Sequence, residues 1–329
     1  MQVGLKLFAE LYSPLELVRQ AVVAEQAGFD FVEMSDHFHP WLDQSDDLPL
    51  AGHSGFAWSV LAMVAARTSS IRFGTGVTCP TVRYHPAIIA QAAATMSILS
   101  EGRFFLGIGS GERLNEHIVG RGWHSVAVRQ EMLREALHII TMLWSGGFHS
   151  FHGKHLQLED ARVYDLPDEL PEILVAAGGP NAARIAADYG GMFTSSTTPD
   201  PALVKVHREQ GGSGTIFGEM FIAYDPDSKE AGLRAGARSA RWAALGVQAL
   251  PEIPRASAFE SATQFIQTSD LANAVVAGPE AADYVAQAEK FAAAGIDGLA
   301  FVNCSPDIDK FIDFAAEHLI ETIHGMKTA

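Results

Sequence analysis

The sequence predicts an α/β fold, a (β/α)8 TIM barrel with insertions, on three observations. Short apolar runs alternate with helical patterns along most of the chain, as expected of βαβ units that build a parallel sheet covered on both faces. The length of 329 residues suits a barrel, which commonly needs about 250 residues or more. One turn, Ala-Gly followed by an aromatic or β-branched residue and Asp, recurs at 27–30 and 294–297. Its glycine suits the left-handed end of a helix that turns directly into a strand.

The apolar runs and helical patterns can be followed in order. Predicted strands at 3–8, 29–34, 71–77 and 103–109 alternate with predicted helices at 14–27, 54–67 and 86–99. After a longer connection come a helix at 127–144, a strand at 172–177, a helix at 181–189 and a strand at 192–196. This order gathers the strand-to-helix loops, which carry the chemistry of barrel enzymes, at one end of the barrel.

Three stretches interrupt the alternation, at about 111–127, 145–170 and 243–268. The second has alternating apolar residues and turn signals, which predict a small hairpin before strand 5. The first and third follow strands 4 and 7, where long loops are usually functional, and the third is expected to form a mobile cover. We expect a single (β/α)8-barrel domain over 1–329 that carries all three.

The composition excludes several classes of protein. The net charge of −16, from 23 Lys and Arg against 39 Asp and Glu, argues against a protein that grips nucleic acid or a membrane surface. No run approaches the roughly 20 apolar residues of a membrane span, and the N-terminus does not resemble a signal peptide, so we expect a cytoplasmic location. Cys79 and Cys304 are far apart and encode neither a disulfide framework nor a thiolate metal site.

The segment Ser-Asp-His-Phe-His-Pro-Trp at 35–41 directly follows a predicted strand. In a barrel this places Asp36, His37 and Trp41 at the catalytic end, where they offer a proton acceptor, a hydrogen-bond partner and a flat stacking surface. His37 and His39 form a His-x-His pair that could hold a divalent ion in a hydrolase. The ends of the next strands do not supply the remaining ligands, so we expect no metal.

Glycine-rich stretches end three other predicted strands. At 107–112, Gly-Ile-Gly-Ser-Gly-Glu departs from the dinucleotide fingerprint, which needs G-x-G-x-x-G opening a helix. It leaves a bare backbone that a ring system could approach, followed by the carboxyl of Glu112 and the amide of Asn115. At 74–77, Gly76 and Val77 close a strand in a similar way. Arg83 in the following loop could offer a cation to a ligand, although such an arginine more commonly pairs at the surface.

The stretch Ala-Ala-Gly-Gly-Pro-Asn at 176–181 places a proline at a helix start after two glycines. Such a turn leaves backbone N–H groups at an open helix N-terminus, where phosphate binds well. An ordinary strand-to-helix turn explains the same residues. Ala177, Gly178 and Gly179 are therefore candidates for a phosphate site, with both interpretations open.

Together these segments resemble the luciferase-like superfamily of flavin and deazaflavin oxidoreductases, specifically its F420-dependent branch, which includes glucose-6-phosphate dehydrogenases. The resemblance spans nearly the whole chain, and its most specific pieces are the stretches 35–41, 74–86, 105–116 and 176–180. It implies a barrel with insertions, usually dimeric, which holds the deazaflavin coenzyme F420 at the C-terminal face and its phosphate near the Gly-Gly turn.

The resemblance also implies residue roles. His37 would be the catalytic base, Trp41 would steady the reacting intermediate, and Glu112 would donate a proton to the reduced ring. The bond between Gly76 and Val77 is similar to a non-proline cis peptide of the family. The residues implied to line the coenzyme are Asp36, Gly76, Val77, Asn115, Ala177, Gly178 and Gly179.

The chain differs from the glucose-6-phosphate enzymes where they bind sugar phosphate. Those enzymes carry Lys and Arg residues at positions that match 195–198 and 271–274, where this chain has Ser-Ser-Thr-Thr and Leu-Ala-Asn-Ala. A dianionic phosphate would be poorly neutralised there.

We therefore predict an oxidoreductase that transfers a hydride between F420 and a small alcohol, sugar or carbonyl substrate. A pKa near the working pH would suit His37 as its base. The alternatives are an FMN-dependent luciferase-like monooxygenase, a metal-dependent hydrolase that uses His37 and His39, and a silent cofactor-binding protein.

Overall fold

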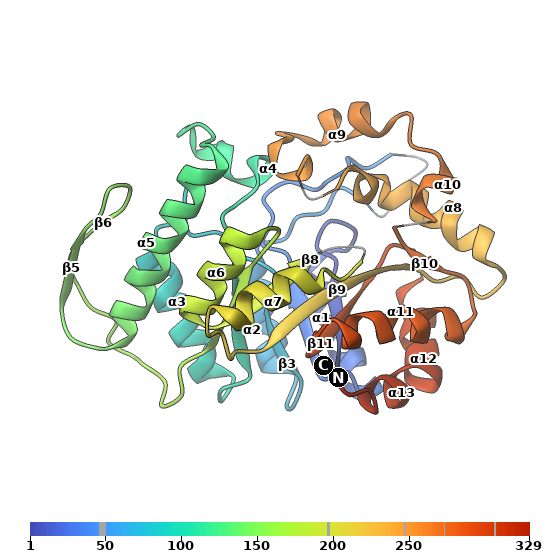
Figure 1. Cartoon of the computed structure of the whole chain (residues 1–329), viewed down its shortest axis with the longest axis horizontal. Helices are drawn as coiled ribbons and strands as arrows, with labels where there is room; N and C mark the ends of the chain where they lie inside the picture. The colour runs from blue at the N-terminus through green and yellow to red at the C-terminus, as the bar shows by residue number, and fades with distance from the viewer. Residues whose placement is uncertain (46–50, 196–197, 247, 273, 306) are drawn as a thin grey trace.

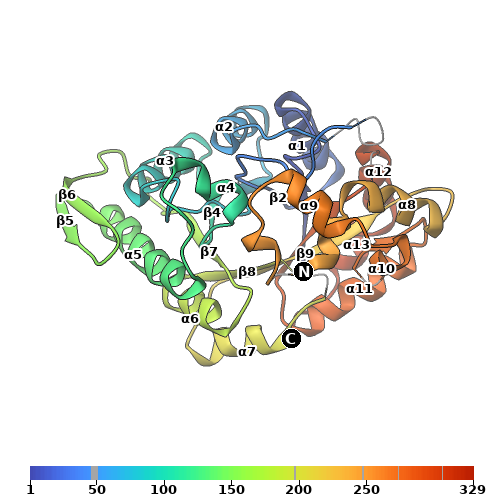
Figure 2. The same ribbon diagram turned by 90° about the horizontal axis from the view of Figure 1, so that it is seen from above.

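Parallel strands close into a ring in the computed structural model, which describes residues 1–45, 51–195, 198–246, 248–272, 274–305 and 307–329. Eight strands form this barrel in the described part of the chain, and helices cover its outside (Figures 1 and 2). Each strand pairs in parallel with its neighbours, and the last pairs with β1 from Gln2 with Gly298 to Leu5 with Phe301. The barrel strands are β1 (Gln2–Leu7), β2 (Phe31–Met34), β3 (Arg72–Thr75), β4 (Phe104–Ile108), β7 (Glu172–Ala176), β8 (Gly191–Ser195), β9 (Ile216–Ala223) and β11 (Gly298–Asn303). The predicted fold class is confirmed.

The outer helices follow the strands in the predicted order. They are α1 (Pro14–Ala27), α2 (Ala57–Arg67), α3 (Pro86–Leu99), α5 (Val126–Trp144), α6 (Pro180–Tyr189), α7 (Pro201–Glu209), α11 (Ala281–Ala293), α12 (Ile308–His318) and α13 (Ile320–His324). The side chain of Ser13 caps α1, and proline stands in the first turn of both α1 and α3. Such start signals explain why the sequence predicts both of these helices to the residue.

The insertions lie where the sequence places them. After β4 come α4 (Arg113–Glu116) and a 3-10 turn, η1 (His117–Val119), and the hairpin of β5 (His149–His152) and β6 (Gln157–Ala161) precedes β7. The segment after β9 contains α8 (Lys229–Ser239), η2 (Arg241–Leu245), η3 (Leu250–Glu252), α9 (Ala256–Thr263), α10 (Thr268–Leu271) and β10 (Val276–Ala277). The predicted cover at 243–268 includes residue 247, which lies outside the described residues. In Figure 1 the hairpin stands apart beside α5, and α4 and α9 lie at the upper end of the barrel.

Three phenylalanine rings fill the middle of the barrel. Phe31 and Phe217 stack with centroids 4.3 Å apart, and Phe105 meets both of them edge to face. Room for these rings comes from glycines on neighbouring strands, because a Cβ on Gly4 would lie 2.3 Å from the Phe31 ring and one on Gly298 would lie 2.6 Å from the Phe217 ring. The barrel is therefore packed solid below its catalytic end.

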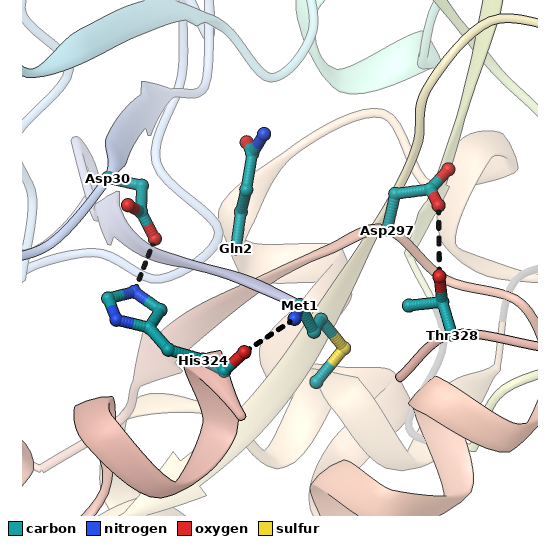
Figure 3. Close-up of a pocket in the computed structure, with 6 residues that line it drawn as sticks. All are labelled: Met1, Gln2, Asp30, Asp297, His324 and Thr328. Atoms are coloured by element: carbon teal, nitrogen blue, oxygen red, sulfur yellow. Dashed lines mark hydrogen bonds and ion pairs between the residues drawn. The ribbon is translucent and has the colours of Figure 1, made fainter. Parts of the chain in front are cut away.

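The opposite end of the barrel shows the recurring turn predicted from the sequence. Gly28 and Gly295 have φ values of 91° and 86°. The carboxylates that follow cap neighbouring strands, since Asp30 accepts from the Val3 N–H at 2.7 Å and Asp297 from the Ile216 N–H at 2.9 Å. Both carboxylates border a depression of about 370 Å³ that is lined by Met1, Gln2, Asp30, Asp297, His324 and Thr328 (Figure 3).

Within the described ranges no helix is both long enough and apolar enough to span a membrane. The single-domain boundaries 1–329 stay a prediction.

We predict that Gly4→Ala destabilises the protein by roughly 1–3 kcal/mol, because the new methyl group overpacks the barrel against Phe31. Denaturant unfolding followed by circular dichroism measures the change. The double variant with Phe31→Leu removes the ring and should recover part of the loss. Equal stability of Gly4→Ala and the wild type would contradict this account of the core.

Candidate active site

The loops that carry the predicted site residues meet at the C-terminal ends of the barrel strands. The loop after β2 reaches the loop after β4, where His37 Nε2 lies 3.3 Å from Glu112 Oε2. The chain after β3 lies between them, and Thr78 forms a parallel bridge with Ile108 of β4. The predicted convergence of these loops is therefore present. The end of β7 joins them, since a Cβ on Gly109 would lie 3.5 Å from that of Ala176.

His37 lies between two carboxylates. Its Nδ1 is 2.6 Å from Oε1 of Glu10, a buried residue in the loop after β1, and its Nε2 faces Glu112. The hydroxyl of Ser35 donates to both oxygens of Glu10, at 3.0 and 3.1 Å. Glu10 thus fixes the ring through Nδ1 and leaves Nε2 as the nitrogen that can exchange a proton with a reactant.

Glu10 is absent from the sequence prediction, and it changes the charge of His37. Burial opposes a charge on this imidazole, but Glu10 and then Glu112 outweigh it and raise the pKa of His37 to about 10. Burial alone would raise the pKa of Glu10, whereas His37 and Lys6 lower it below its usual value. In this structure His37 therefore holds a proton at neutral pH, unlike the expected base with a pKa near the working pH.

Trp41 belongs to an aromatic cluster beside His37. The two ring centroids lie 5.0 Å apart, and Trp41 stacks on Trp242 of η2 at 4.7 Å with 14° between the planes. Phe259 of α9 meets Trp41 edge to face, and Phe8 and Phe221 meet Trp242 in the same way. The insertion after β9 therefore reaches the site through a buried aromatic wall, of which the sequence analysis found only Trp41.

Asp36 and Arg83 form a buried polar anchor for the loop after β2. The Asp36 carboxylate accepts hydrogen bonds from Thr78 and Tyr84 and pairs with Arg83, whose guanidinium also donates to the Asp36 carbonyl. Arg83 is 7% exposed, which corrects the expected surface pair, because Asp36 and Glu116 compensate its charge inside the protein. Burial raises the pKa of Glu116 to about 7 although Arg83 opposes the shift.

Asn115 braces the loop after β2. Its side-chain oxygen accepts from the N–H groups of Phe38 and His39 at 2.8 and 3.2 Å, and its amide donates to Glu112 at 3.3 Å. One side chain thus sets both the loop of His37 and the orientation of Glu112. Its predicted contact with a coenzyme is not tested by this geometry.

The glycine-rich strand ends have two different surroundings. A Cβ on Gly107 would lie 1.8 Å from the Thr75 carbonyl oxygen, and one on Gly109 would lie 2.8 Å from Val77. The two glycines therefore allow the end of β3 and the residues after it to pack closely against β4. The Gly76–Val77 peptide is cis, as the family resemblance implies.

Gly178 and Gly179 have open space where a Cβ would be, and Gly179 begins α6 without a side-chain cap. An uncapped helix start with open glycines suits an incoming phosphate.

His39 and His37 have separate partners. The Nδ1 of His39 lies 2.8 Å from the Leu114 carbonyl oxygen, and its ring stacks on His117. The residues that the structure describes contain no group of three or more His, Cys, Asp or Glu placed to hold a metal ion.

The family model for luciferase-like monooxygenases matches residues 1–212. The chain belongs to this luciferase-like family. The predicted family resemblance is confirmed.

Among curated relatives in this family, an F420-dependent hydroxymycolic acid dehydrogenase of Mycobacterium tuberculosis is 47% identical over 188 residues, which cover 57% of this chain and 51% of that enzyme. An F420-dependent glucose-6-phosphate dehydrogenase of Amycolatopsis mediterranei is 33% identical over 343 residues and covers 99% of both chains. A solved structure of an F420-dependent secondary alcohol dehydrogenase with an F420-acetone adduct is 28% identical, covers 98% of both chains and superposes with a TM-score of 0.87.

We predict that Glu10→Gln lowers the pKa of His37 by roughly 1–3 pH units, because the variant removes the closest opposite charge. NMR titration of the His37 imidazole measures it, with His207, whose ring contacts Gly190 instead, as an internal control. The raised pKa means that the His37 proton stabilises the fold fully below pH 6.5, and this contribution is lost as the pH rises toward about 10. An unchanged His37 titration in the variant would refute the role assigned to Glu10.

Proposed function

We propose that this protein is an F420-dependent dehydrogenase or reductase that acts on a CH–OH or C=O group of a small, uncharged substrate. The observation that carries the proposal is the row of Glu10, His37 and Glu112 at the mouth of the barrel, with 2.6 and 3.3 Å between successive partners. The named relatives bear out the predicted coenzyme and enzyme class, and they leave the substrate open.

The residues at the mouth suit the proposed coenzyme. Gly178 and Gly179, with the start of α6, would receive its phosphate, and Ala177 would lie beside them. The chain at Gly76 and Val77 would form a wall for the ring, and Asp36 and Asn115 would hold the loops around it. When bound, the deazaflavin supplies hydride transfer.

His37 would manage the substrate proton through Nε2. In the reducing direction the protonated ring would give its proton to a carbonyl oxygen, and in the oxidising direction the neutral ring would take the proton from a hydroxyl. Glu10 stabilises the charged ring in both directions. In the oxidising direction Glu112, whose side chain is 30% exposed and lies 3.3 Å from Nε2, would first take the proton of His37, which leaves that ring neutral, and would then give this proton to the coenzyme ring.

The aromatic wall favours a substrate whose remaining part is apolar. Trp41 lies beside His37 and Trp242 stacks on Trp41, so the wall of the site next to His37 is aromatic and carries no charge. The positions matching the sugar-phosphate cations include residues 196, 197 and 273, which lie outside the described residues. In the sequence, neither 195–198 nor 271–274 contains Lys or Arg. The lack of these cations supports an alcohol or carbonyl compound as the substrate over a sugar phosphate.

We predict that His37→Ala and Glu112→Gln bind F420 with nearly wild-type affinity and slow turnover by about 100-fold or more, as typical for a lost general acid or base. Fluorescence quenching of F420 measures binding, and the absorbance of the coenzyme measures turnover over a panel of alcohols and ketones. Lys205→Ala, on the exposed outer helix α7, serves as the control. A protein that binds FMN instead of F420, or variants that turn over normally, would overturn the proposal.

We also propose that the chain forms a homodimer, which the family resemblance implies. Exposed apolar side chains on the neighbouring helices α2 and α3 support it, since Met63 is 47%, Ile88 58% and Leu99 64% exposed. Sedimentation velocity should give twice the chain mass of 35.3 kDa, and Met63→Asp should shift the mass toward the monomer. A monomeric wild type would contradict the dimer.

The cytoplasmic location stays a prediction.

A further inference from the structure

A second group of charges lies inside the barrel, deeper than His37, and takes no part in the proposed proton transfer. Lys6 of β1 donates to Glu219 of β9 at 2.5 Å and lies 3.6 Å from Glu33 of β2. The side chains of these three residues are 9%, 4% and 0% exposed, respectively. Each of the three lies two residues further along its strand than a residue of the phenylalanine layer, namely Gly4, Phe217 and Phe31.

Lys6 also holds the wall of the site. Its Nζ donates to the carbonyl oxygen of Gly76 at 2.6 Å, and the N–H of Gly76 donates to the Met34 carbonyl at 2.8 Å. A Cβ on Gly76 would lie 2.2 Å from Oε2 of Glu33. The Gly76 backbone is therefore fixed from three sides, and Val77 follows it into the mouth of the barrel.

The two carboxylates lie at different distances from Lys6, 2.5 Å for Glu219 and 3.6 Å for Glu33. Burial opposes the charge of Lys6, but Glu219 and Glu33 raise its pKa above the usual range. Burial raises the pKa of Glu33 well above its usual value, and Lys6 offsets this only in part. Lys6 and Glu219 thus form the ion pair, and Glu33 is a neutral acid beside it.

Stability alone does not account for such an ion pair. Burying two charges costs desolvation, and apolar side chains of similar size are often equally stable or more stable in the same place. The adjacent layer of the barrel shows that this chain can fill its interior with aromatic rings. What apolar side chains could not supply is a donor for the Gly76 carbonyl.

We propose that Lys6 is a positioning residue, which holds the Gly76 carbonyl so that the chain at Gly76 and Val77 keeps the shape needed to receive the coenzyme ring. Glu219 is its counter-ion. The inference rests on the proposed function, because it assumes that the ring lies against this wall.

The test uses the double variant Lys6→Met with Glu219→Gln, because Lys6→Met alone would leave a buried carboxylate unpaired and endanger folding. The matched control is Arg72→Met with Glu172→Gln. It removes an ion pair of 2.8 Å at the first residues of β3 and β7, at the opposite end of the barrel.

Fluorescence quenching should show that the Lys6/Glu219 variant binds F420 roughly ten- to a hundredfold more weakly, the range expected for the loss of one charge-assisted hydrogen bond. The Arg72/Glu172 control should bind within about twofold of the wild type on the same scale. Hydrogen exchange of the protein without added coenzyme should be faster at residues 76–79 in the Lys6/Glu219 variant only.

Wild-type affinity and unchanged exchange at 76–79 in the Lys6/Glu219 variant would overturn the inference and leave the proposed function intact. A wild type that does not bind F420 would instead overturn the proposed function, and the exchange measurement would still test whether Lys6 holds this wall. Should the double variant not fold, Lys6→Met with Glu219→Met, an apolar pair of similar size that also lacks a donor for Gly76, provides the same comparison.

Discussion

A closed ring of parallel strands forces every strand to end on the same side, and this constraint assembles the candidate site. Glu10, His37 and Glu112 are far apart in the sequence, yet each follows the end of a barrel strand. Below them the barrel passes from a charged layer around Lys6 to a layer of packed phenylalanines. Solvent access therefore falls with depth, and the groups able to exchange protons lie where a reactant can enter.

The electrostatics of the mouth depend on pairing. Burial opposes the positive charges of His37 and Arg83. Glu10 and Glu112 on both sides of the His37 ring outweigh this effect and keep the ring protonated. Asp36 and Glu116 compensate the guanidinium of Arg83, which stays charged throughout. The chemistry proposed for His37 thus depends on carboxylates from two other loops. Ground-state protonation makes the ring ready to protonate a carbonyl, whereas oxidation requires that the proton leave first.

Local signals in the sequence were sufficient for the fold and for most of the mouth. Ser13 and two prolines mark helix starts, and the segment with His37 follows a strand that alternation alone predicts. Glu10 also directly follows a strand, which is the signal that could have found it. The ion-pair partners of His37 and Arg83 were not predicted. No sequence pattern near these residues indicates that Glu10 contacts His37, or that Arg83 is buried in an ion pair with Asp36. Trp242 escaped for the same reason, since a tertiary contact brings it to Trp41 across about 200 residues of chain.

The contact of Trp41 with Trp242 joins the part of the chain that the family model matches to a part beyond it. Glu10, His37, Glu112 and the Gly-Gly turn all lie within the 212 residues that the family model matches, whereas Trp242 and Phe259 lie beyond them. The later segment reaches the reaction centre through stacked rings and supplies none of the groups proposed to move a proton. Changes in the later segment can therefore alter the wall beside His37 while the residues proposed to move a proton stay the same, so this segment is the part to exchange between relatives when the aim is to accept new molecules.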